Sequence, residues 1–227
     1  MTGRQEQILR LVVENYIHSV EPIGSKFLGE SADLDVSGAT IRNELRLLEE
    51  EGYLTHPHTS AGRIPTELGY QYYVSNLITQ RVLEEDQQKT LQTILNQFPT
   101  QKEKVKGMAK FAAHYARNAV IIGFDRKSLY YTGMSNLFSQ PEFQDYQYTV
   151  NVSSVFDECE AKIPQVVGNM PKDEIKVFIG QENPFGKICS ALCLRFDDEG
   201  LFILLGPMRM DYEKNIALFQ KIHELTS

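Results

Sequence analysis

Apolar side chains in the first fifty residues recur at helical spacing in three separate runs. The run over residues 4–19 places them on one broad face, which is typical of a helix packed on two neighbours. A shorter run predicts a second helix that is anchored by Phe27 and Leu28. The third run predicts a helix with Ser37 as its N-cap and Gly52 just past its end. The apolar face of the first helix consists of Ile8, Leu9, Leu11, Val12, Val13, Tyr16 and Ile17.

The third predicted helix has two chemically different faces. Ile41, Leu45 and Leu48 have the spacing of a face that packs on a core. An acidic run, residues 49–51, closes the helix. Recognition helices contact bases with their N-terminal half, so this polarity is what a DNA-contacting helix needs, with its acids away from the groove. The spacing alone still favours an ordinary amphipathic helix with solvated arginines. The predicted contact face consists of Ala39, Arg42, Asn43 and Arg46.

The stretch YLTHPHTSAGRIPT, residues 53–66, predicts a β-hairpin. Its two ends have strand character, and a polar turn rich in small residues separates them. Three helices followed by a hairpin form the winged-helix arrangement, and Arg63 at the hairpin base is placed to reach a phosphate or the minor groove. Thr66 then predicts the cap of a further helix. Its apolar stripe belongs either to the core or to a dimer interface, and it consists of Tyr70, Tyr73, Val74 and Leu77.

The remainder of the chain mixes helical and strand patterns. Two helical segments are predicted between residues 79 and 118, and residues 153–167 and 211–225 predict two more helices. Helices gathered on a mainly antiparallel sheet give an α+β fold class. The predicted strands are AVIIGF (119–124), SLYYTG (128–133), YQYTVNV (146–152), IKVFIG (175–180), ICSALCLRF (188–196) and GLFILLG (200–206).

Composition and charge narrow the possible functions. The chain has 227 residues, of which 42% are hydrophobic, and a formal net charge of −7. No apolar run approaches the ~20 residues of a membrane span, and charged residues interrupt the start of the chain, so we expect a cytoplasmic protein. The first 80 residues hold six basic and eleven acidic side chains, which argues against non-specific binding to nucleic acid. Phosphate binding depends on local charge, however. The direction in which the arginine side chains point therefore decides whether this part of the chain can bind DNA.

Other chemistries have weaker signals in the sequence. His56 and His58 form one HxH pair with no third ligand nearby, so a polar turn explains them better than a metal site. Cys189 and Cys193 lie four residues apart in a predicted strand, and nothing basic adjoins them to lower a thiol pKa. We therefore expect core thiols and no redox switch. Three cysteines without a CxxC also do not predict a disulfide framework.

Arg209 and Asp211 suggest a catalytic pair, but a glycine–proline turn into a helix capped by Asp211 explains them better. The loop at residues 180–186 has neither P-loop nor GxGxxG spacing. No nucleophile is paired with a base, and no metal cluster or cofactor loop is evident. The sequence therefore predicts no enzyme and no cofactor.

Several blocks of the chain carry a more specific signal. In the first part these are YIHSVEPIGSK, SGATIRNEL, EEGYLTHPHTSAGRIPT and GYQYYV, and in the second GMSNLFSQPEF, FIGQEN and GPMRMDYEKNIAL. The chain resembles the HrcA family of bacterial heat-inducible transcription repressors in these blocks. The resemblance implies a winged-helix domain joined to a GAF-like domain. It also implies a dimer that binds an inverted-repeat operator upstream of chaperone genes and is kept active by the GroE chaperonin.

With this resemblance, the spacing of the third helix favours DNA contact over an ordinary amphipathic helix with solvated arginines. We expect Arg42, Asn43 and Arg46 to carry base information, since arginine pairs well with guanine and asparagine with adenine. The full set of predicted DNA contacts is Ser37, Ala39, Thr40, Arg42, Asn43, Arg46, His58, Thr59, Ser60 and Arg63. The predicted domains are a DNA-binding domain at 1–78, a helical connector at 79–101 and an α+β domain at 102–227.

The chain departs from the family pattern at two places. Family members are typically about half as long again, and the missing stretch falls between AVIIGFDRK and SLYYTGMSNLF, where the family carries an inserted dimerisation domain. The resemblance therefore predicts a dimer but not its mode of association. Gln71 stands where an arginine is expected after GY. A second hypothesis remains open, in which the GAF-like domain is the pocket of a small-molecule sensor and DNA binding is the output.

Overall fold

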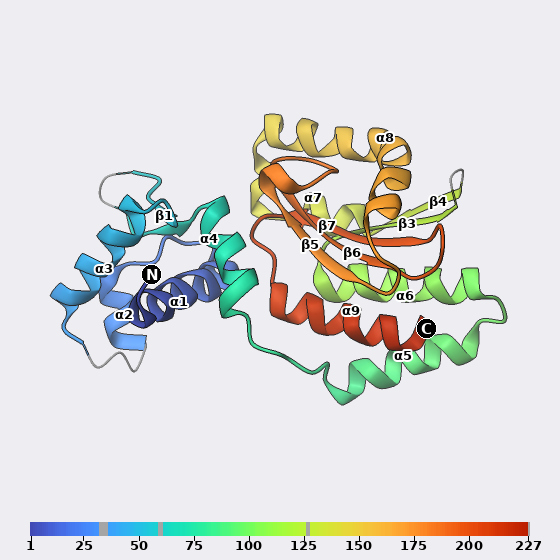
Figure 1. Cartoon of the computed structure of the whole chain (residues 1–227), viewed down its shortest axis with the longest axis horizontal. Coiled ribbons are helices and arrows are strands. Elements are labelled where there is room, and N and C mark those ends of the chain that lie inside the picture. Colours follow the sequence, from blue (N-terminus) through green and yellow to red (C-terminus); the bar gives the residue numbers. More distant parts are fainter. Residues whose placement is uncertain (32–35, 59–60, 126–127, 227) are drawn as a thin grey trace. The chain divides into compact units, whose positions relative to one another are not determined.

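The computed structural model describes residues 1–31, 36–58, 61–125 and 128–226 (Figure 1). The chain divides into two compact units, Met1–Thr79 and Gln80–Ser227. Helices are combined with antiparallel strands, so the fold class is α+β, as the sequence predicts.

The first unit contains helices and one short pair of strands. Its elements are α1 (Gly3–Ser19), α2 (Ser25–Ser31), α3 (Gly38–Glu50), β1 (Leu54–Thr55), β2 (Ile64–Pro65), α4 (Glu67–Tyr72) and a π-helical turn (Tyr73–Leu77). The strands β1 and β2 pair antiparallel, with Leu54 opposite Pro65. The order of elements agrees with the helices and hairpin that the sequence predicts.

Helix α3 begins and packs as its sequence indicates. The Ser37 side chain accepts a hydrogen bond from the Thr40 amide at 3.2 Å, which confirms the predicted N-cap. Ile41, Leu45 and Leu48 are buried and form its inner face. Gly52 follows the helix with φ of +82°, a left-handed conformation that glycine adopts without a steric penalty.

The prediction for α2 is half wrong. Leu28 is buried as expected, but Phe27 has 44% of its surface exposed. A helix of two turns presents only one narrow stripe to the core, and adjacent residues on a helix point about 100° apart, so only one of them enters that stripe.

The hairpin is joined by the segment that precedes α2. The Ile23 amide donates to the Arg63 carbonyl at 2.9 Å, and the Arg63 amide donates to the Ile23 carbonyl at 2.8 Å. Gly62 lies so close to this segment that an added Cβ would be 2.5 Å from the Ile23 carbonyl carbon. The glycine is therefore needed for the close approach of two backbones.

The aromatic stripe after the hairpin lies partly in the core of the first unit. Thr66 caps α4 by accepting from the Gly69 amide at 3.1 Å, as predicted. Tyr70 and Tyr73 are 3% and 2% exposed, so of the two alternatives for these tyrosines the structure shows core packing.

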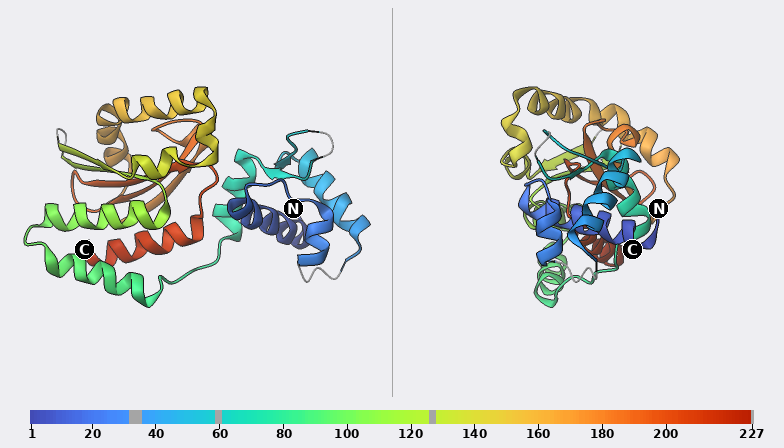
Figure 2. Two further views of the ribbon diagram at one scale, coloured as in Figure 1. Left: turned by 180° about the vertical axis from the view of Figure 1, so that it is seen from behind. Right: turned by 90° about the vertical axis from the view of Figure 1, so that its left-hand side faces the viewer.

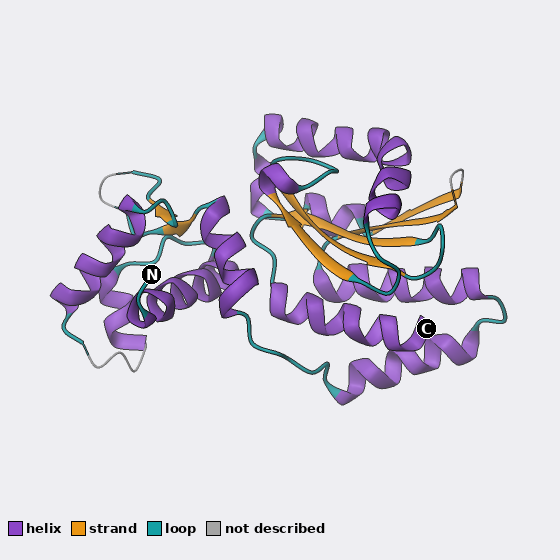
Figure 3. Ribbon diagram, viewed as in Figure 1, coloured by secondary structure: helices purple, strands orange, loops and turns teal. Residues whose placement is uncertain are grey.

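The second unit is built around an antiparallel sheet (Figure 3). Among the described residues it has five strands in the order β4-β3-β7-β6-β5. The strands are β3 (Ala119–Asp125), β4 (Ser128–Thr132), β5 (Ile175–Ile179), β6 (Cys189–Arg195) and β7 (Leu201–Pro207). The helices are α5 (Glu85–Gln97), α6 (Gln101–Ala116), α7 (Met134–Phe138), α8 (Tyr146–Asn169) and α9 (Tyr212–Thr226), with short 3-10 turns at Pro141–Gln144 and Gly180–Glu182.

Helices cover both faces of this sheet (Figures 1 and 2). Helices α6 and α9 lie on one face and α8 on the other, so the central strands β3, β6 and β7 are buried along almost their entire length. A strand that is buried on both sides has apolar residues at consecutive positions, and this explains why these stretches read as continuous hydrophobic runs.

One predicted strand, YQYTVNV at residues 146–152, is wrong. These residues form the first two turns of α8, and the predicted helix 153–167 is its continuation. The Asp145 side chain accepts from the Tyr148 amide at 3.0 Å and caps the helix. The alternation of apolar residues suggested a strand with one buried face, yet Tyr146 is 80% and Val150 is 43% exposed. The face that packs on the sheet follows helical spacing instead, through Val152, Val155 and Cys159.

Candidate nucleic-acid interface

The outer face of α3 is polar and open. Ala39, Arg42, Asn43 and Arg46 are all exposed, on the side of the helix opposite its buried leucines. Arg42 has no ion-pair partner within the described ranges. It is therefore the most available cation of this face.

The N-terminal end of α3 supplies hydroxyl and amide groups. The Ser37 and Thr40 hydroxyls lie 3.0 Å apart, and Ser37 is exposed. The first amides of a helix carry partial positive charge and have no partner within the helix, so an anion is stabilised there. Ser37, Thr40 and the helix end can together receive a phosphate oxygen.

Arg46 is held by two residues of its own helix. It forms an ion pair with Glu50, and its Nη2 donates to Asn43 Oδ1 at 3.2 Å. The Arg46 and Glu50 side chains are 54% and 56% exposed, so solvent screens the pair strongly.

Arg63 is held by the C-terminal end of the same helix. Its Nη2 lies 2.7 Å from Glu49 Oε2, and both side chains are only 23% exposed. His56 contacts the other oxygen of Glu49. The acidic run thus lies at the far end of α3, as the sequence predicts, but it does not stand apart from the arginines. Glu49 joins the hairpin to the helix.

His58, Thr59 and Ser60 are the remaining predicted contacts. His58 is exposed. Thr59 and Ser60 lie outside the described residues. Gln71, at the position where the resemblance predicts an arginine, donates from Nε2 to Glu67 Oε1 at 3.3 Å. The sequence signal for the site was the spacing of α3, and the same spacing places Glu50 four residues after Arg46. The contact of Glu49 with Arg63 had no local signal.

Arg209 and Asp211 have structural roles in the second unit. Arg209 pairs with Glu142 through two contacts of 2.7 and 3.2 Å, and Asp211 accepts from the Lys214 amide at 3.1 Å at the start of α9. These contacts confirm the cap that the sequence predicts for Asp211. Arg209 thus ties the segment before α9 to the turn before α8.

All three cysteines are buried in the second unit. Burial raises the pKa of the Cys189 thiol to about 12 and raises the pKa of the Cys159 and Cys193 thiols above the ordinary value. Because the thiolate is the reactive form, these thiols are inert at neutral pH.

We expect a disulfide reagent at pH 8 to label no cysteine in the folded protein and all three in denaturant. The physical reason is that burial blocks access and also disfavours the thiolate. Absorbance of the released thiol measures the number of reacted groups. Rapid labelling of any one cysteine without denaturant would contradict the assignment as core thiols.

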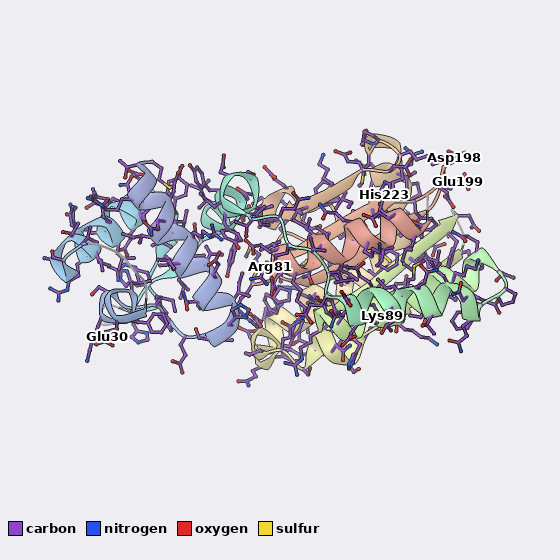
Figure 4. All side chains as sticks on the ribbon, turned by 90° about the horizontal axis from the view of Figure 1, so that it is seen from below. Glu30, Arg81, Lys89, Asp198, Glu199 and His223 are labelled. Atoms are coloured by element: carbon purple, nitrogen blue, oxygen red, sulfur yellow. The ribbon has the colours of Figure 1, made fainter. Side chains whose placement is uncertain are left out.

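The sheet face under α8 is filled by apolar side chains from the helix and from β3, β6 and β7. At its rim lies a cavity of about 310 Å³, beside Asp198 and Glu199 in the connection between β6 and β7 (Figure 4). Arg195, which also lines it, directs its guanidinium nitrogens to the backbone carbonyls of Met170, Asp197 and Asp198. Its guanidinium group is thus hydrogen-bonded within the protein.

Within the described ranges, no group of three or more His, Cys, Asp or Glu side chains is arranged to hold a metal ion. No helix in that part of the chain has the length and apolar character needed to cross a membrane.

An exposed helix face with arginines, a helix N-terminus and an adjoining hairpin is typical of proteins that bind nucleic acid. Comparison with known proteins identifies the family to which the chain belongs. A family model for the HrcA protein C terminal domain matches residues 66–216, more than half of the chain. The chain therefore belongs to the HrcA family.

Named relatives match shorter segments. A segment of 85 residues is 54% identical to the heat-inducible transcription repressor HrcA of Brevibacillus brevis, covering 37% of this chain and 25% of that protein. A segment of 120 residues is 43% identical to the protein of the same name in Bifidobacterium longum, covering 53% of this chain and 32% of the relative. The matches thus span less than two thirds of the relatives' length.

One solved structure shares the fold. It is described as the crystal structure of a hypothetical protein at 2.2 Å resolution, and it superimposes with a TM-score of 0.78 at 17% identity. The match covers 100% of this chain and 98% of that one.

Proposed function

We propose that this protein is a sequence-specific DNA-binding repressor of heat-shock chaperone genes. The observation that carries the proposal is the exposed face of α3, with Arg42 available and Asn43 and Arg46 beside it, in a chain of the HrcA family. The named relatives are heat-inducible transcription repressors. The proposal places the protein in the cytoplasm, and it involves no catalysis and no cofactor.

The proposed domains follow the sequence prediction. Residues 1–78 form a winged-helix DNA-binding domain, which the order of three helices and the β1–β2 hairpin supports. Residues 79–101 connect it to a GAF-like domain at 102–227, which the antiparallel sheet and its covering helices support.

The proposed contacts divide into base and backbone contacts. Arg42, Asn43 and Arg46 read base edges in the major groove from the exposed face of α3. The other contacts position the helix and the hairpin on phosphates and in the groove. They are Ser37, Ala39, Thr40, His58, Thr59, Ser60 and Arg63.

Two protomers related by a two-fold axis bind an inverted-repeat operator, because the symmetry of a dimer matches that of the repeat. Bound at a promoter, the dimer blocks polymerase. Heat releases it, either through loss of support from the GroE chaperonin or through the repressor's own limited stability.

Fluorescence anisotropy tests this function with the full chain and two duplexes. One duplex carries the family's inverted repeat, and the other carries the same bases scrambled. We expect a preference of ~10³ or more for the repeat. Equal, weak binding to both duplexes, with and without added chaperonin, would overturn the proposal.

We expect Arg63→Ala to weaken binding to both duplexes alike and to flatten the dependence of log K on log salt concentration by about 0.9. A phosphate contact carries no base information, and its loss removes one released counterion. The slope is measured by titration at four salt concentrations. An unchanged slope would show that Arg63 serves only to hold the hairpin to Glu49.

A further inference from the structure

The acidic run at the end of α3 contacts an arginine of the proposed DNA-binding face directly. The Arg46 guanidinium lies between Glu50, four residues later, and Asn43, three residues earlier. All three side chains are exposed. In the protein without DNA, this cation is therefore already held by a carboxylate.

A carboxylate offers an arginine the same kind of charge-assisted hydrogen bond that a phosphate offers. Glu50 thus occupies on Arg46 the position that a DNA phosphate oxygen would take. Arg63 repeats the arrangement, since Glu49 Oε2 lies 2.7 Å from its Nη2. Two cations near the proposed groove each hold an internal anion.

We propose that Glu50 competes with DNA for Arg46: it withholds Arg46 from the phosphates of non-operator DNA, and it must be displaced when the operator binds. This inference rests on the proposed function. On the operator, base contacts by Arg42 and Asn43 bring α3 fully into the groove, and a DNA group replaces Glu50 on Arg46. On other sequences the helix is not held closely enough for the exchange, and Arg46 stays with Glu50.

The strength of the pair suits this role. Both side chains are more than half exposed, and an ion pair in that setting shifts an equilibrium by no more than about five-fold. The contacts of a specific complex can break such a pair, whereas the loose encounter with a random sequence gains too little from one phosphate to do so.

Glu50→Gln tests the role, because the amide keeps the shape of the side chain and removes its charge. Glu51→Gln is the matched control: it makes the same change of net charge one residue further on. Glu51 is exposed, and it has no ion-pair partner in the part of the chain that the structure describes. The full chain is titrated by anisotropy against the inverted repeat and the scrambled duplex at four salt concentrations.

We expect Glu50→Gln to bind the scrambled duplex about three- to five-fold more tightly than the wild type, with a salt slope steeper by about 0.9. Binding to the inverted repeat tightens at least as much but keeps its slope, because Arg46 contacts DNA there in both proteins and only the wild type must first break the pair with Glu50. Glu51→Gln changes neither duplex by more than about two-fold, as expected for a screened charge.

Equal effects of the two substitutions on the scrambled duplex, or no effect of either, would overturn the role of Glu50. That result leaves the proposed function standing if the wild type still prefers the repeat. A wild type without any preference would overturn the proposed function, and the inference falls with it.

Discussion

Arg42→Ala is expected to weaken binding to the inverted repeat by about 5- to 150-fold, equivalent to ~1–3 kcal/mol, while binding to the scrambled duplex changes little. Arg42 is exposed on the outer face of α3 and has no ion-pair partner among the described residues. Its guanidinium is therefore free to make the two hydrogen bonds that distinguish guanine from the other bases. The measurement is anisotropy against both duplexes at one salt concentration.

The control for this substitution removes the same charge elsewhere in the first unit. Arg10 lies on α1 and pairs with Glu14 at 2.7 Å. We expect Arg10→Ala to leave the preference for the repeat unchanged. A library of operators with single base changes adds a second test, because Arg42→Ala should lose discrimination at one position in each half-site. An equal loss on all sequences would show that Arg42 contacts only phosphate.

Gly62→Ala is expected to destabilise the first unit by ~2–3 kcal/mol, near the upper end of the cost of inserting one methyl group into a packed interior. The added Cβ would lie 2.5 Å from the Ile23 carbonyl carbon and 2.6 Å from its oxygen. Because these are backbone atoms, no side-chain rotation relieves the clash. The paired hydrogen bonds between Ile23 and Arg63 must lengthen or break.

Amide hydrogen exchange in α1 measures this effect, since those amides report the first unit separately from the second. Gly3→Ala provides the control, because a Cβ at Gly3 meets nothing within 4 Å. That variant should be neutral or slightly stabilising, as alanine is the better helix former. Equal protection of α1 in the Gly62→Ala variant would show that the hairpin accommodates the methyl group.

Gly62→Ala is expected to affect DNA binding as well as stability. Gly62 precedes Arg63, and both lie where the hairpin meets the segment before α2. If the hairpin moves, Arg63 also leaves Glu49, and the contact between hairpin and helix is lost. Gly62→Ala should therefore weaken DNA binding more than its effect on unfolding alone accounts for.

Local patterns were sufficient for much of the fold. Helix α3 was predictable because its cap, its buried face and its terminal glycine all lie within residues 37–52. The strands β3, β6 and β7 were predictable because burial on both faces requires uninterrupted apolar residues. The predictions from sequence were wrong at Phe27 and at residues 146–152. At both places the structure depended on which face of the segment packed on the core.

The candidate site also combines features that local sequence predicts with features that tertiary contacts decide. The sequence by itself determined which residues share the outer face of α3, because helical periodicity places Arg42, Asn43 and Arg46 together whatever surrounds them. Only the tertiary structure decided the partner of Arg63, because the hairpin and the end of α3 meet through packing that local spacing does not encode. The direction of the Arg63 side chain thus depends on contacts between segments, and those contacts form only when the chain has folded.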